Sequence, residues 1–247
     1  MSTFSPEQNQ KTFLAYIAEL RVSLIHILIF IFSIFLILTP FSRNIYVVLT
    51  YPLLKKLPSN ASMIATDVTS TFLAPFKLTF LLAVLITIPF VFYKIWKFLC
   101  PALYHRERRI ISFILPTSIF LFYSGVAVAY LIVLPIVLGF FITIAPSNVT
   151  PMTDVYSYLN FCLKLFLVFG ISFQIPIIVL ILILLGVTDI ETLKRKRPYI
   201  IVGCFFIAIF VTPPDIFSMA LVGSAMCLLF ECGLFLASIL ILRNRKV

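Results

Sequence analysis

The residues of this sequence that could most clearly form ion pairs or bind a charged ligand are acidic residues next to basic ones. Glu107 lies between Arg106 and Arg108 in CPALYHRERRIISFILP, residues 100–116, and Glu19 lies two residues before Arg21. Such carboxylates can pair with their own neighbours, and surface pairs of this kind contribute about 0–1 kcal/mol. The nearby arginines should keep Glu107 ionised. Local pairing is the simple interpretation of Glu107, and a helix-surface charge next to the membrane is that of Glu19. A binding function is the alternative for both.

Catalytic and metal-binding patterns are not indicated. His26 lies in an apolar run and His105 lies among arginines, with no nucleophile beside either. The sequence has no HExxH, GxSxG or Walker pattern, and its 7 glycines do not form a phosphate-binding loop. We interpret the cysteines as small buried apolar residues; they are Cys100, Cys162, Cys204, Cys227 and Cys232. We therefore expect no enzyme, no metal and no cofactor.

The composition is that of an integral membrane protein. Of the 247 residues, 62% are hydrophobic and only 11% are charged, whereas soluble domains have about a quarter charged residues. The net charge of +10 would suggest nucleic acid as the partner of a soluble protein. In a membrane protein this positive charge is better explained by the orientation of the chain in the membrane, because Lys and Arg accumulate on the cytoplasmic side. The N-terminus does not resemble a cleavable signal peptide.

Six apolar runs are candidates to cross a hydrocarbon core of roughly 30 Å. The residues Pro213 and Pro214 divide the last long run, because two prolines cannot continue a helix. The fifth run rises only about 21 Å, and Glu231 returns to about the level of Tyr199. We expect this last hairpin to lie in locally thinned membrane. The expected helices form one all-α domain and span about 22–39, 73–93, 110–134, 158–185, 199–212 and 216–242.

The basic residues predict the orientation of these helices. Most Lys and Arg outside the spans lie in the N-terminal segment, the connections 94–109 and 186–198, and the tail. Only Arg43, Lys55 and Lys56 lie in connections on the other side. Both termini are therefore expected in the cytoplasm.

Three polar residues inside the spans need an explanation, because ionisable groups in a membrane are costly and often functional. Snorkelling to the nearest interface is the simple interpretation of Lys77 and Lys164. Gln174 could satisfy the backbone carbonyl that Pro176 leaves unpaired, or it could form an intramembrane polar site. Lys164 and Gln174 are ten residues apart, which puts them about 80° apart around the helix, so they could border one cavity but do not stack.

Two acids belong to the region of the last expected helix, one just before it and one within it. Asp215 follows two prolines and precedes the apolar run, which is typical of an N-cap residue. Glu231 lies fifteen residues after Ile216 and could be an interfacial anchor or a functional acid.

Four motifs occur in the order typical of a known family. They are YIAELR (16–21), PALYHRERR (101–109), KRPYIIVG (196–203) and TPPDIFS (212–218). The chain thereby resembles the TatC family, the signal-peptide-receptor subunit of the twin-arginine translocase. The resemblance implies a six-helix, glove-shaped bundle with a concave face and short helices 5 and 6. It also implies TatA- and TatB-type partners, self-association, and export of folded proteins driven by the protonmotive force.

The resemblance also assigns roles to individual residues. Glu19 and Glu107, with Arg21 and the aromatic residue Phe98 nearby, would recognise the paired arginines of a signal peptide. Pro52 would belong to the outer cap. A guanidinium fits a carboxylate with two parallel hydrogen bonds, which an ammonium cannot form, so we expect discrimination between twin-arginine and twin-lysine peptides.

The remaining candidates form the expected intramembrane and partner-contact set: Gln174, Asp215, Met219 and Glu231. Gln174 stands where many relatives have Glu, and an amide cannot titrate. Met219 stands where some relatives have Gln. The family implies a bacterial cytoplasmic (inner) membrane, with an organellar membrane as the alternative. A proton- or solute-coupled transporter and a lipid-clustering scaffold are the competing classes; a scaffold would tolerate loss of Glu19 and Glu107.

Overall fold

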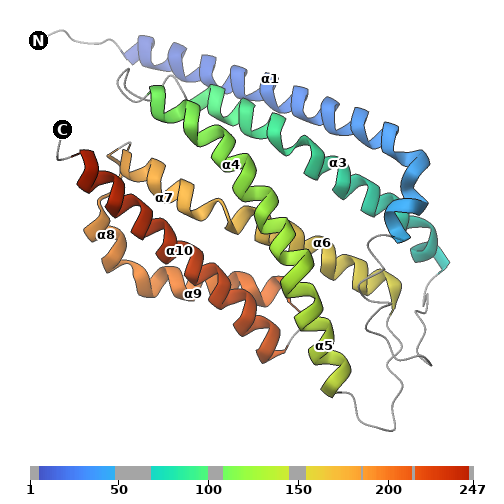
Figure 1. The fold of residues 1–247 in the computed structure, drawn as a ribbon. Helices are drawn as coiled ribbons and strands as arrows, with labels where there is room; N and C mark the ends of the chain where they lie inside the picture. The colour runs from blue at the N-terminus through green and yellow to red at the C-terminus, as the bar shows by residue number, and fades with distance from the viewer. Residues whose placement is uncertain are drawn as a thin grey trace, which may run out of the picture.

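The computed structural model describes residues 6–47, 68–99, 108–144, 154–184, 186–212 and 215–244. These residues are almost entirely helical, which confirms the expected all-α class (Figure 1). The elements are α1 (Pro6–Leu38), the 3₁₀ turn η1 (Thr39–Phe41), α3 (Val68–Leu99), α4 (Arg108–Val128), the π-helical η4 (Ala129–Val133), α5 (Leu134–Ile144), α6 (Val155–Ser172), α7 (Ile175–Leu184), α8 (Ile190–Arg195), α9 (Arg197–Val211) and α10 (Ile216–Asn244).

Five helical segments of the described chain are long and apolar enough to cross a membrane. They are Ala18–Val47, Leu73–Lys97, Ile114–Phe141, Val155–Ile183 and Ile216–Ile239. The helix α9 is apolar but has only 15 residues, and it corresponds to the short fifth span expected from the sequence. The protein is therefore a bundle of membrane-crossing helices that ends in a hairpin of one short and one long helix.

Two of the expected spans differ from the observed helices. The third span does not end near residue 134, because the helix continues through η4 and α5 to Ile144. Pro135 has no N–H to donate, and the wider π-turn just before it lets the helix continue. The fourth span is not one continuous helix: it breaks at residues 173–174. Pro176 cannot donate to the carbonyl of Ser172, so the regular backbone bonding is interrupted there.

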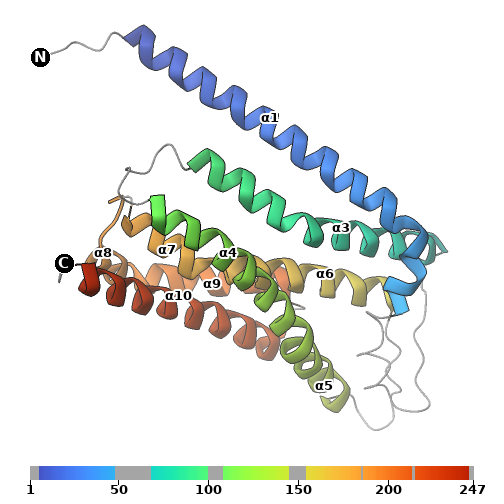
Figure 2. The ribbon, with the colours of Figure 1, turned by 45° about the horizontal axis from the view of Figure 1, so that its top comes forward.

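The helices are arranged around a core made by α3, α4 and α6. The largest buried cluster contains Phe122 of α4 and Leu159, Leu165 and Phe169 of α6. The helix α1 packs mainly along α3 and lies at the edge of the bundle, with none of its apolar span buried (Figure 2). On the other side, α10 packs against α7 and α9. The fold is therefore a central three-helix core with α1 on one side and the α9–α10 hairpin on the other.

Several close helix contacts depend on glycine. A Cβ atom on Gly170 of α6 would lie 2.6 Å from the ring of Phe122. A Cβ atom on Gly233 of α10 would lie 2.8 Å from the Cα of Pro176, at the start of α7. Small residues let helix backbones approach closely in membranes. The absence of a side chain at Gly233 therefore lets α10 pack directly against the break between α6 and α7.

Candidate functional site

Basic residues gather at one end of the bundle. The N-terminal end of α1, the C-terminal end of α3, the start of α4, the short helix α8 and the end of α10 lie at this end (Figure 1). Lys97 lies in the last turn of α3, Arg108 begins α4, and Lys194 and Arg195 lie in the last turn of α8. We call this end of the bundle the basic end.

Two of the sequence-predicted receptor residues lie at the basic end. Glu19 and Arg21 are exposed on α1, at the point where its apolar span begins with Ala18. Glu107 and Pro52 lie outside the described residues, and the side chain of Phe98, in the last turn of α3, is also outside them. An exposed carboxylate at the membrane boundary can accept hydrogen bonds from a cationic ligand that arrives from the aqueous phase.

Glu231 forms an ion pair that links the last two helices. Its Oε2 lies 2.7 Å from Nη2 of Arg197, the first residue of α9. This contact confirms that Glu231 returns to about the level of Tyr199, and it shows that the acid is paired. Both side chains are a little under half exposed, so solvent screening leaves the pair a modest contribution to stability. The pair fixes the relative height of α9 and α10 at the basic end.

Gln174 is buried at the break between α6 and α7, with 8% of its surface exposed. Its Nε2 donates a hydrogen bond of 3.0 Å to the carbonyl oxygen of Ser118 on α4. Of the two interpretations of Gln174, satisfaction of the carbonyl released by Pro176 is not what the structure shows, because the amide donates to another helix. Lys164 is exposed on α6 while Gln174 is buried, so the two do not border one cavity. Gln174 joins the broken helix to α4.

Asp215 and Met219 lie at the end of the bundle opposite the basic end (Figure 1). The backbone N–H of Ser218 donates a hydrogen bond of 2.6 Å to Oδ2 of Asp215, which confirms the predicted N-cap of α10. Met219 is half-buried against the main core. The residues between Asp215 and Glu231 rise about 24 Å along the helix axis. The structure therefore does not bring Asp215, Gln174 and Glu231 together into one site.

The prediction that the cysteines are buried is only partly correct. Cys162 and Cys204 are buried, but Cys227 is half-buried and Cys232 is exposed on α10. One face of α10 lies on the outside of the bundle. The helical repeat of the sequence did not show which residues of α10 lie on that face and which are packed. Cys100 lies outside the described residues.

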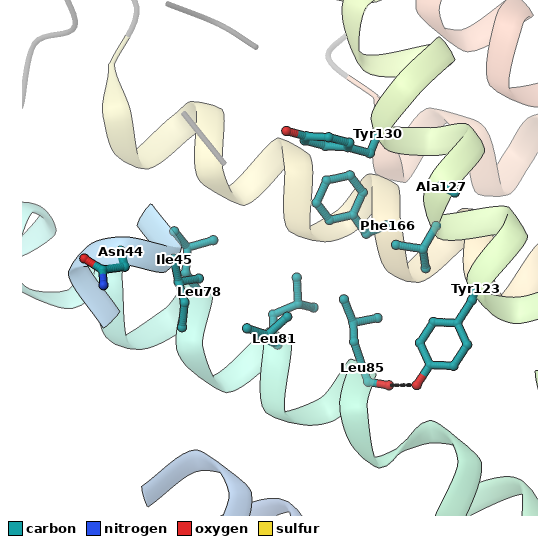
Figure 3. Close-up of a pocket in the computed structure, with 11 residues that line it drawn as sticks. Asn44, Ile45, Leu78, Leu81, Leu85, Tyr123, Ala127, Tyr130 and Phe166 are labelled. Carbon is teal, nitrogen blue, oxygen red and sulfur yellow. Dashed lines mark hydrogen bonds between the residues drawn. The ribbon is translucent and has the colours of Figure 1, made fainter. Parts of the chain in front are cut away.

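An apolar cavity of about 550 Å³ lies between the helical residues 42–47 that follow η1 and the segments α3, α4, η4 and α6. Leu78, Leu81 and Leu85 of α3 form one wall, and Phe166 of α6 lies opposite (Figure 3). The hydroxyl of Tyr123 donates to the carbonyl oxygen of Leu85 at 3.0 Å, so this polar group is satisfied. Apolar walls suit hydrocarbon rather than a charged solute. Sequence reasoning missed the cavity because separate helices supply its lining.

The fold and these contacts define a polytopic α-helical membrane protein with exposed acidic and basic side chains at one end. The model of the family described as "Sec-independent protein translocase protein (TatC)" matches residues 15–224. The chain belongs to the TatC family. This result confirms the resemblance noted from its four motifs.

Similar proteins and structures cover nearly the whole chain. The TatC protein of Haemophilus influenzae is 46% identical, over 91% of this chain and 88% of the relative. The TatC protein of Escherichia coli K12 is 40% identical, over 97% of this chain and 93% of the relative. A crystal structure of the twin-arginine translocase receptor TatC is 33% identical and superposes with a TM-score of 0.83, covering 91% of this chain and 98% of that one.

Proposed function

We propose that this chain is the signal-peptide receptor of a twin-arginine translocase, and that it takes part in the export of folded proteins. The observation that carries the proposal is the structural similarity to the twin-arginine translocase receptor over almost the full chain. The exposed position of Glu19 on α1 supports it, since a receptor for arginine side chains needs carboxylates that water and peptide can reach. Glu107 is the second receptor carboxylate in this proposal.

Recognition would depend on the geometry of the guanidinium group. Each arginine presents a planar fork of N–H donors that a carboxylate accepts through two parallel hydrogen bonds. A lysine ammonium is a more strongly hydrated point charge and cannot make this paired contact. The arginines next to Glu107 in the sequence would favour its carboxylate form. Two such acids select two consecutive arginines over two lysines.

In the proposed orientation the basic end lies in the cytoplasm of a bacterium, with both chain termini on that side of the inner membrane. The support is the gathering of Lys97, Lys194 and Arg195 at this end, because cytoplasmic segments carry an excess of Lys and Arg. Membership of a family whose similar proteins come from bacteria supports the inner membrane. The fifteen-residue α9 supports the earlier suggestion that the last hairpin thins the membrane locally.

Partner contacts are proposed for the α9–α10 hairpin. TatA- and TatB-type single-span subunits would contact its outer end near Asp215 and Met219, and copies of the chain would self-associate. The protonmotive force would supply the energy of transport. A proton step through position 174 is not part of this proposal, because Gln174 cannot titrate and its amide is engaged by Ser118. The chain would act as a receptor and assembly subunit and would not catalyse a covalent reaction.

The test is peptide binding to the purified full-length protein. A twin-arginine signal peptide and its twin-lysine counterpart would be titrated against the wild type and the variants Glu19→Gln, Glu107→Gln and Glu191→Gln. Glu191 lies in the first turn of α8 and is exposed, so its variant is a matched control for loss of one acid. We expect the wild type and Glu191→Gln to prefer the twin-arginine peptide, and the other two variants to lose that preference. Equal binding of both peptides to the wild type would refute the proposal.

A further inference from the structure

The outward face of α6 carries a polar stripe that the receptor function does not use. Tyr156, Asn160 and Lys164 follow one another at intervals of four residues, so they lie on one face of the helix. Tyr156 and Lys164 are exposed and Asn160 is half-buried. Lys77 of the neighbouring helix α3 completes the group. We call these four residues the lysine stripe.

Contacts across the two helices hold one lysine in the stripe. Nζ of Lys77 donates a hydrogen bond to Oδ1 of Asn160. The same ammonium lies 5.0 Å from the centre of the Tyr156 ring, in cation–π contact. Both contacts are with uncharged groups, and no ion pair of Lys77 occurs within the described part of the chain. Lys77 is therefore fixed on the surface of the bundle beside α6, instead of extending freely toward the membrane interface.

Lys164 is the second charge of the stripe. It is exposed, inside the apolar span Val155–Ile183, and no acidic group among the described residues lies within ion-pair distance of it. Side chains on a helix tilt toward its N-terminus, which directs Lys164 toward Asn160 and thus toward Lys77. The nearby acid Asp154 is engaged in capping α6, where its Oδ2 accepts hydrogen bonds from the N–H and hydroxyl of Ser157.

The order of groups along this face is that of a phospholipid. Tyr156, Asn160 and Lys164 lie in the first half of the apolar span Val155–Ile183. Farther along, Ile171 lies two turns beyond Lys164 on the same face, and 60% of its surface is exposed. A phosphate beside the two lysines would therefore have its acyl chains beside apolar side chains. Lys is a suitable ligand for phosphate because its ammonium is a compact point charge with three donors.

We propose that the lysine stripe binds the headgroup phosphate of an anionic phospholipid, with Lys77 and Lys164 as the two cationic ligands and Asn160 holding Lys77 in place. The site lies at the end of the bundle opposite the basic end, so it is separate from the proposed peptide receptor. A lipid is favoured over an acidic partner helix because polar and apolar groups follow each other along the face in headgroup-to-chain order.

Native mass spectrometry of the delipidated full-length protein tests the proposal. The probes are dioleoyl phosphatidylglycerol and dioleoyl phosphatidylcholine, which share their acyl chains and differ in net charge. We expect the wild type to prefer phosphatidylglycerol, and Lys77→Gln and Lys164→Gln each to weaken its binding about fivefold, the effect of one basic side chain on an anionic lipid. Lys164→Arg should retain the preference. Lys194→Gln, which removes an exposed lysine at the basic end, should bind like the wild type.

Several results would overturn the inference. Unchanged phosphatidylglycerol binding by Lys164→Gln would do so, and this variant remains informative even if Lys77→Gln misfolds through loss of its Asn160 contact. An equal loss in Lys194→Gln would indicate non-specific attraction, and displacement of the lipid by excess inorganic phosphate would indicate a simple anion site. A photo-crosslinking residue at Ile171 in native membranes should form lipid adducts; a protein adduct would assign this face to a partner helix.

Discussion

Replacing Gly233 with alanine tests the closest contact between α10 and the broken fourth span. The added Cβ would meet the Cα of Pro176 at 2.8 Å, and a backbone atom cannot rotate away as a flexible side chain can. Overpacking of this kind costs typically about 1–3 kcal/mol. Alanine also improves helix propensity over glycine by about 1 kcal/mol. We therefore expect a net loss of about 0–2 kcal/mol in the free energy of unfolding.

Gly203→Ala separates the steric cost from the gain in propensity. A Cβ on Gly203 of α9 would have no heavy atom within 4 Å, so this variant should only gain, by up to about 1 kcal/mol. The difference between the two variants then isolates the overpacking cost of about 1–3 kcal/mol.

The single tryptophan provides the signal for this measurement. Trp96 is 6% exposed and packs with Ile114 of α4 and Ile177, the residue after Pro176. Its fluorescence during reversible SDS unfolding in mixed micelles should report loss of the contacts around the break. If Gly233→Ala is as stable as Gly203→Ala, the backbones of α7 and α10 do not approach as closely as described, and the reasoning fails.

Three further contacts are tested by the same unfolding assay. Asp215→Ala removes the cap of α10 and should cost about 0.5–2 kcal/mol, with Asp215→Asn retaining most of it. Gln174→Leu removes the hydrogen bond to Ser118 and should cost about 0.5–1.5 kcal/mol; a neutral result would mean that the bond contributes nothing. A double-mutant cycle of Arg197→Gln and Glu231→Gln should give a coupling of about 0–1 kcal/mol, reduced by salt, because the pair is partly exposed; a larger, salt-insensitive coupling would contradict this.

Local patterns in the sequence were sufficient for several features. The short fifth helix followed from the distance between the basic segment before it and the two prolines after it. The cap at Asp215 followed from its position between those prolines and an apolar run. The height of Glu231 followed from helix rise alone, and its pairing with Arg197 is consistent with that estimate. Each of these depends on neighbours in the chain or on a fixed helical repeat.

Other features depended on contacts between helices and were not predictable in this way. The acceptor of Gln174 is a carbonyl on α4, 56 residues away in the chain. The sequence offered the local carbonyl near Pro176 as one of two alternatives and gave no indication of Ser118. Lys77 likewise contacts Asn160, 83 residues away, where snorkelling to the interface was expected. Polar groups in an apolar environment take whichever partner packing brings within reach.

The sequence by itself determined the membrane class, the family and the charge asymmetry of this protein, because these follow from composition, from motifs in order and from the positions of Lys and Arg. Only the tertiary structure decided that Gly233 lies against the break in the fourth span, and that Lys77 and Lys164 share one outward face. These outcomes depend on how closely helix backbones approach and how the helices are rotated about their axes. Hydropathy along the chain carries little of that information, since lipid-facing and packed positions in a membrane are both apolar.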